Sequence, residues 1–171
     1  MSGARPVAPI LVLAWGNRAR GDDALGPLAL DALRARWAAL TEGDPARRDA
    51  VDFLEDHQLA VEHALDVVGR QAVLWIDASR DAAPPFAVQP LAPRRDPSFT
   101  SHALSPQAVL QVYADLHGTA PPPGWLLGIA GRDFGLGLAP GAEGLANLAA
   151  AVDWAAGWLA QALPGAAGPP G

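Results

Sequence analysis

The chain contains no cysteine and no lysine, and it has no long apolar run. Without cysteine it can form neither disulfides nor thiolate metal sites, and it has no cysteine nucleophile, which fits a reducing compartment. No apolar segment approaches the ~20 residues that a membrane helix needs. The N-terminal segment MSGARPVAP lacks the apolar run and cleavage site of a signal peptide. We therefore expect a cytoplasmic protein with no membrane partner.

All twelve basic residues are arginines, and they are scattered among eighteen acidic residues, for a formal net charge of −6. Nucleic-acid binding depends on clustered cations, so this charge pattern argues against a nucleic-acid partner. Half of the 171 residues are hydrophobic and 18% are charged, which is typical of one compact domain. We expect a single domain over 1–171, with loose ends at 1–8 and 164–171.

The order of apolar runs and amphipathic segments predicts an α/β fold. Continuous or short apolar runs predict strands at 10–15, 51–54, 72–76, 86–91 and 125–129, with 86–91 at an edge. Helical spacing and cap residues predict helices at 24–40, 59–67, 106–116 and 142–163. This alternation indicates a three-layer α/β/α sandwich with a mainly parallel, doubly wound sheet. In such sheets ligands bind beyond the carboxyl ends of the strands.

The turn after the first strand does not suit phosphate. Gly16 and Gly21 have the spacing of a phosphate-binding loop, but Asp22 and Asp23 stand where a lysine and a hydroxyl residue are required. Two carboxylates there would repel phosphate. Nucleophilic hydrolysis is also disfavoured, because the chain lacks a G-x-S-x-G elbow and the paired D-T/S-G turns of aspartic proteases.

Metal binding uses the polar residues that are present. Asp23 follows the first strand, Asp77 ends another, and His102 lies in an irregular stretch, so three loops offer two oxygens and one imidazole nitrogen. Three ligands leave open coordination positions, which suits zinc, nickel or a similar divalent ion. Simpler roles stay open: Asp22 or Asp23 could cap the helix, Asp77 could form a turn, and His102 could be a surface residue.

The other three histidines are weaker candidates for a ligand. His57 and His63 lie near or on a polar helix face, and His117 closes a helix before Gly118. A histidine at that last position favours the helix dipole without any further role.

Four motifs in sequence order resemble those of the nickel-dependent hydrogenase maturation proteases. They are GNxxxxDDxxG from Gly16 to Gly26, IDAS around Asp77, TSHALSP around His102 and GIAGRDFGLGLAP from Gly128. The resemblance covers most of the chain. It implies an α/β/α sandwich endopeptidase that removes a short C-terminal extension from the large-subunit precursor of a [NiFe] hydrogenase after nickel insertion.

The resemblance also implies the roles of individual residues. Asp23, Asp77 and His102 would contact the metal, which is the nickel of the precursor, with zinc or another divalent ion as a substitute. Asp23 stands where relatives often carry glutamate. The residues expected to support these ligands or to line the substrate groove are Asn17, Asp22, Gly135 and Gly137.

Three finer points are open. The segment FLEDHQLAVEHALD, 53–66, departs from the glycine-rich turn common in the family and resembles the branch that serves cytoplasmic NAD-reducing hydrogenases. The alternative function is a nickel-sensing chaperone that binds the same precursor without cutting it. The sequence leaves open whether the metal is a catalyst or a recognition element.

Overall fold

The computed structural model describes residues 3, 5–97 and 104–163. Its centre is a five-stranded sheet in the order β2-β1-β3-β5-β4, in which β4 runs antiparallel to β5 and the other neighbours are parallel. The strands are β1 (Ile10–Trp15), β2 (Val51–Asp56), β3 (Ala72–Ser79), β4 (Phe86–Pro90) and β5 (Gly124–Ala130). The edge position and antiparallel direction of β4 agree with the proline at its end, which cannot donate to a sheet ladder.

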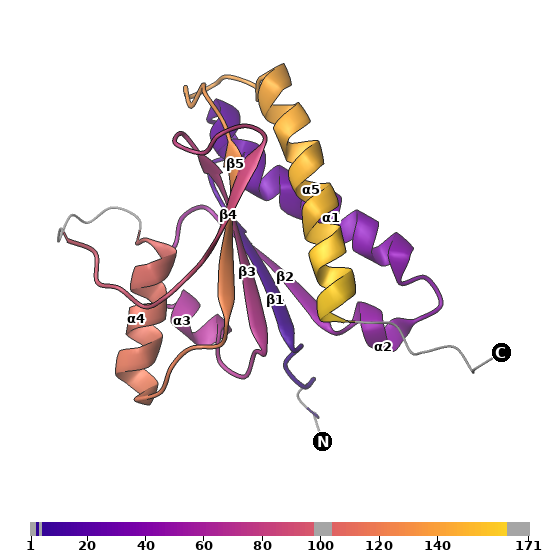
Figure 1. Ribbon diagram of the computed structural model, residues 1–171, viewed down its shortest axis with the longest axis vertical. Helices are drawn as coiled ribbons and strands as arrows, with labels where there is room; N and C mark the ends of the chain where they lie inside the picture. The colour runs from indigo at the N-terminus through magenta and orange to yellow at the C-terminus, as the bar shows by residue number, and fades with distance from the viewer. Residues whose placement is uncertain (1–2, 4, 98–103, 164–171) are drawn as a thin grey trace.

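Helices lie on both faces of this sheet (Figure 1). They are the 3₁₀ helix η1 (Gly21–Ala24) and the α-helices α1 (Leu25–Leu40), α2 (Pro45–Arg48), α3 (His63–Asp66), α4 (Pro106–His117) and α5 (Ala142–Ala162). In Figure 1, α1 and α5 cover one face, and α3 and α4 lie on the other. The expected three-layer sandwich is therefore confirmed.

Strand β1 is the central element of both hydrophobic cores. Its alternate residues Ile10, Val12 and Ala14 pack into the core that includes residues of α1 and α5. The intervening residues Leu11, Leu13 and Trp15 pack into the core that includes residues of α4. All six are buried, because helices cover the strand on both sides. This explains why β1 reads as one continuous apolar run.

The structure differs from the sequence expectations in several elements, among them β2, which continues two residues beyond 54. The predicted helix at 59–67 is reduced to the four residues of α3, preceded by a loop in which Leu59 is buried. The predicted loop at 41–49 contains the single turn α2, whose N-terminus is capped by the Asp44 side chain accepting from the Arg47 N–H. Strand β3 continues three residues beyond 76, because it pairs with β5 as far as Ala130.

The order of the strands creates a switch point between β1 and β3. From β1 the chain passes through α1 to β2 on one side, and it then crosses to β3 on the other side of β1. Connections that leave in opposite directions open a crevice at the carboxyl ends of the two strands, where ligands of doubly wound sheets bind. Within the described ranges, no helix has the length and apolar character required to span a membrane.

Candidate metal-binding groove

An open groove lies at the switch point, beyond the carboxyl ends of β1 and β3. It brings together Asp23 from η1 and Asp77 from β3, which are 54 positions apart in the sequence. The residues that line it are Trp15, Gly16, Asn17, Arg20, Asp23, His57, Gln58 and Asp77. Two of the three predicted ligands, together with Asn17, are thus found in one site.

The turn after β1 holds Asp23 through backbone geometry. Gly16 has a φ of +146°, and a Cβ atom there would lie 2.1 Å from the carbonyl oxygen of Asp23, so this position requires glycine. The N–H of Asn17 then donates to Asp23 Oδ2 at 2.7 Å. Asn17 Oδ1 accepts from the N–H of Ala19 at 2.9 Å, which closes the turn. Asn17 therefore supports Asp23 directly.

The start of α1 sits tightly against the ends of both strands. A Cβ atom on Gly26 would lie 2.6 Å from the carbonyl oxygen of Trp15 and 3.2 Å from that of Ile76. No real Cβ contact is as short as the first distance, so only glycine allows this approach. The close packing brings the short helix that carries Asp23 to the strand that carries Asp77.

Asp77 is an acid that lines the groove together with a second carboxylate, Asp23, and with Arg20. Burial and, to a smaller extent, the negative charge of Asp23 together raise its pKa to about 7, against an opposing effect of the Ala78 backbone N–H. Asp77 lies inside β3 and pairs with Gly128 of β5, so it is not the turn former that a strand-end position allowed. Two adjacent carboxylates of this kind gain from a bound cation.

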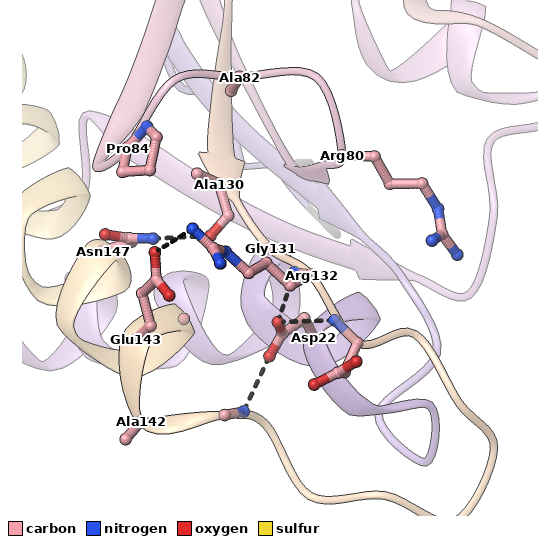
Figure 2. A pocket seen from close by; sticks show the side chains of 13 residues that line it. Asp22, Arg80, Ala82, Pro84, Ala130, Gly131, Arg132, Ala142, Glu143 and Asn147 are labelled. Carbon is pink, nitrogen blue, oxygen red and sulfur yellow. Dashed lines mark hydrogen bonds and ion pairs between the residues drawn. The ribbon is translucent and has the colours of Figure 1, made fainter.

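Asp22 has the opposite environment, as Figure 2 shows. Its Oδ2 accepts from the backbone N–H groups of Arg132 (2.8 Å) and Asp133 (3.2 Å), and its Oδ1 accepts from that of Gly141 (2.9 Å). Burial alone would raise the pKa of Asp22, but the three hydrogen bonds outweigh burial and lower it. Neither η1 nor α1 has a side-chain cap hydrogen bond, so the alternative that Asp22 or Asp23 caps this helix is wrong.

The glycine-rich loop at 131–141 is joined to the turn after β1 by backbone hydrogen bonds. Gly21 N–H donates to the carbonyl of Leu138 at 2.9 Å, and Gly137 N–H donates to that of Ala19 at 2.7 Å. Gly137 has a φ of +81°, and Leu138 N–H donates to the carbonyl of Gly135. Gly135 and Gly137 shape the part of the loop that is hydrogen-bonded to the turn after β1. Neither of them lines the groove.

His57 and Gln58 also line the groove, and the sequence analysis missed both. They follow β2, which is the other neighbour of β1. Ligands of such sheets bind beyond the carboxyl ends of the strands, and this rule applies to β2 as well as to β1 and β3. The position of His57 directly after a predicted strand could therefore have identified it. His57 was instead assigned to the polar residues near a helix, because a helix was predicted to begin at residue 59.

His102 lies outside the described residues. Leu104, the first described residue after it, donates its N–H to the carbonyl of Leu59 at 3.4 Å, in the loop that follows Gln58. In the part of the chain that the structure describes, no group of three or more His, Cys, Asp or Glu side chains could hold a metal ion. The described donor set is a pair of carboxylates, which fits a divalent cation that receives further ligands elsewhere.

The fold and the groove define an α/β/α protein with an acidic site at the sheet switch point. Solved structures of the same fold include the hydrogenase-maturating endopeptidase HybD from E. coli, at 22% identity and a TM-score of 0.65 over 90% of this chain and 93% of that one. The [NiFe] hydrogenase maturation protease HycI from Thermococcus kodakarensis is 21% identical, with a TM-score of 0.62 over 89% and 92%.

A third structure, the hydrogenase 2 maturation peptidase from a Thaumarchaeota archaeon, is 24% identical, with a TM-score of 0.58 over 88% of this chain and 97% of that one. No protein-family model matches this chain, and no curated protein matches it in sequence. At these identities the likeness shows the shared fold.

Proposed function

We propose that this chain is an endopeptidase that removes the C-terminal extension from a nickel-loaded large-subunit precursor of a [NiFe] hydrogenase. Asp23, Asp77 and His102 would receive the nickel that the precursor carries. The proposal is supported by the motifs at these positions and by a fold shared with proteins described as hydrogenase maturation proteases. The precursor would be met in the cytoplasm and would belong to an NAD-reducing hydrogenase.

The observation that carries the proposal is the pair formed by Asp23 and Asp77. The two side chains line one groove, and the charge of Asp23 contributes to a pKa of about 7 at Asp77. Such a pair is poorly stabilised when both members are charged and is relieved either by a proton or by a cation. A divalent ion brought by the precursor would take the place of the proton near neutral pH.

This chemistry explains how a chain without cysteine or a serine elbow could hydrolyse a peptide bond. A bound divalent ion supplies Lewis acidity, which polarises a carbonyl or lowers the pKa of water. The chain itself would hold the ion through Asp23 and Asp77, fix Asp23 through the N–H of Asn17, and release the proton of the Asp77 carboxyl when the ion binds. Zinc or another divalent ion would bind in place of nickel.

The proposal is tested by incubating the purified chain with a nickel-loaded precursor and with the same precursor lacking nickel. We expect mass spectrometry to show loss of the C-terminal peptide from the loaded precursor only. Equal cleavage of both precursors would contradict the role of nickel. A stable complex with unchanged precursor mass would contradict the peptidase and favour the nickel-sensing chaperone.

A further inference from the structure

We propose that His57 is a substrate-binding residue of this groove and that Asp56 and His63 form the pair that positions it. His57 would hydrogen-bond the precursor polypeptide beside the nickel, as a residue that binds the peptide and not the metal. The inference rests on the proposed function, since the ligand is the same precursor. It names a contact that the motifs do not include.

The placement of His57 is the first argument. The residue follows β2 directly, is exposed, and lines the same groove as Asp23 and Asp77. No other histidine of the described ranges lines this groove. Its imidazole can donate a hydrogen bond to a peptide carbonyl or accept one from a peptide N–H.

The second argument is that the backbone at His57 is held from both sides. The N–H of His57 donates to Asp56 Oδ1 at 2.6 Å. The carbonyl of Asp56 accepts from the N–H of Gly16 at 3.2 Å, in the turn that also holds Asp23. Hydrogen bonds of the main chain and of the Asp56 side chain thereby connect the loop that carries His57 to the turn that holds Asp23.

The third argument is the buried histidine behind this loop. The side chain of His63 is only 6% exposed, yet both of its ring nitrogens have partners. Nδ1 accepts from the N–H of Ala60 at 2.9 Å, which leaves the ring proton on Nε2, and Nε2 donates to Asp56 Oδ2 at 3.1 Å. Asp56 therefore joins the buried ring to the backbone of His57.

The His63 ring is buried while its partner Asp56 is half exposed, so the pair anchors an exposed carboxylate to a fixed ring and restricts the loop to one conformation. The conformation fixed here is that of the loop between β2 and α3, which brings His57 to the groove. Arg18, in the turn after β1, also donates two 2.7 Å hydrogen bonds to Glu55 near the end of β2. The groove wall on the β2 side is thus preorganised.

The geometry assigns His57 to the peptide because the described residues do not place its imidazole in a metal-binding cluster with Asp23 and Asp77. A precursor that docks its nickel against the two aspartates must also lay its polypeptide along the groove walls. An exposed, preorganised side chain on such a wall binds substrate at a low cost in conformational entropy.

The test is steady-state cleavage of the nickel-loaded precursor by the wild type and by His57→Ala. We expect KM to rise about tenfold, the value of one hydrogen bond, while kcat changes less than about twofold. His117→Ala is the matched control, because His117 is exposed at the end of α4 and stacks on Tyr113. That variant should keep both constants.

His63→Gln tests the positioning role, and we expect it to raise KM in the same direction as His57→Ala. Combining the two substitutions should raise KM little further, since both act on one contact. Titration with Ni²⁺ alone separates the metal from the peptide: His57→Ala should keep the wild-type affinity, and Asp23→Ala should lose it.

The outcomes distinguish the inference from the function on which it rests. Absence of cleavage by the wild type would overturn the proposed function. With an active wild type, an unchanged KM for His57→Ala, or a fall in kcat at constant KM, would overturn the binding role of His57. Loss of Ni²⁺ affinity in His57→Ala would make it a metal ligand and overturn its assignment to the peptide.

Discussion

Two neighbouring acids on one short helix, Asp22 and Asp23, belong to regions with opposite electrostatics. Asp22 turns toward the loop at 131–141 and accepts three backbone hydrogen bonds, which lower its pKa. Asp23 lines the groove, where burial and, to a smaller extent, the charge of Asp23 raise the pKa of Asp77 to about 7. The first region satisfies its charge within the fold, and the second leaves its charge for a ligand.

The comparison shows how a folded chain gives two adjacent acids different electrostatic surroundings. Backbone N–H groups satisfy a carboxylate permanently, so a cation has little to gain at Asp22. Two carboxylates with few donors around them lack such compensation and are poised for a cation. The same residue type therefore has two roles one position apart.

The largest expected effect is on cleavage of the precursor. Asp23→Ala and Asp77→Ala should each reduce it about a thousandfold or more, because each removes a ligand to the nickel. The fold should persist, since these groups at the groove contribute little to the core. The measurement is product formation by mass spectrometry, with thermal unfolding recorded in parallel.

Asp115→Ala is the control for that experiment, because Asp115 is an exposed acid on α4, paired with Arg95. It should cleave at the wild-type rate. Normal cleavage by Asp23→Ala would mean that the two regions had been assigned the wrong way round.

The next effect is on stability and concerns Asp22. Asp22→Ala leaves three N–H groups of the glycine-rich loop without their acceptor, which should lower the free energy of unfolding by about 2–4 kcal/mol. Urea unfolding measures this loss. Asp153→Ala, which removes an exposed partner of Arg36, should change it by less than about 0.5 kcal/mol. Equal effects of the two substitutions would remove the contrast between Asp22 and a surface acid.

Asp77→Asn is expected to raise the free energy of unfolding, by less than Asp22→Ala lowers it. The folded protein holds a proton on Asp77 up to about pH 7, whereas the unfolded chain releases it near the ordinary pKa of 3.8. Because the folded state binds more protons in this window, wild-type stability falls as pH rises from about 4 to about 7 and then levels off.

Asparagine cannot ionise, so Asp77→Asn should be more stable than the wild type by about 1–3 kcal/mol at pH 8 and by little at pH 4. Thermal unfolding at the two pH values measures the difference. The same variant should fail to process the precursor. A gain that was equal at both pH values would show that the ionisation of Asp77 is not its cause.

The smallest predicted effect is the tenfold rise in KM for His57→Ala. It extends the comparison to a third kind of groove residue, one that binds the peptide without affecting the metal. If Asp56→Asn left KM unchanged while His57→Ala raised it, His57 would bind substrate without needing the Asp56–His63 pair. The precursor cleavage assay decides this with the same constants.

Much of the site could be predicted from the sequence. Continuous apolar runs identified β1 and β3, and the rule for carboxyl ends of parallel strands then brought Asp23 and Asp77 to one rim. The partners of Asp22 could not be predicted, because they are backbone groups more than 100 positions away. His57 was missed because the loop before α3, in which Leu59 is the buried residue, was predicted to be a helix from residue 59.

The sequence by itself determined the strands, their helical covering and the candidate ligands Asp23 and Asp77, because these follow from hydrophobic periodicity and from glycine positions close by in the chain. Only the tertiary structure decided which aspartate faces which partner. Against the effect of burial, backbone donors of the loop at 131–141 lower the pKa of Asp22, whereas burial and the charge of Asp23 raise the pKa of Asp77. Tertiary packing thus distinguishes Asp22 from Asp23, which are adjacent in the chain.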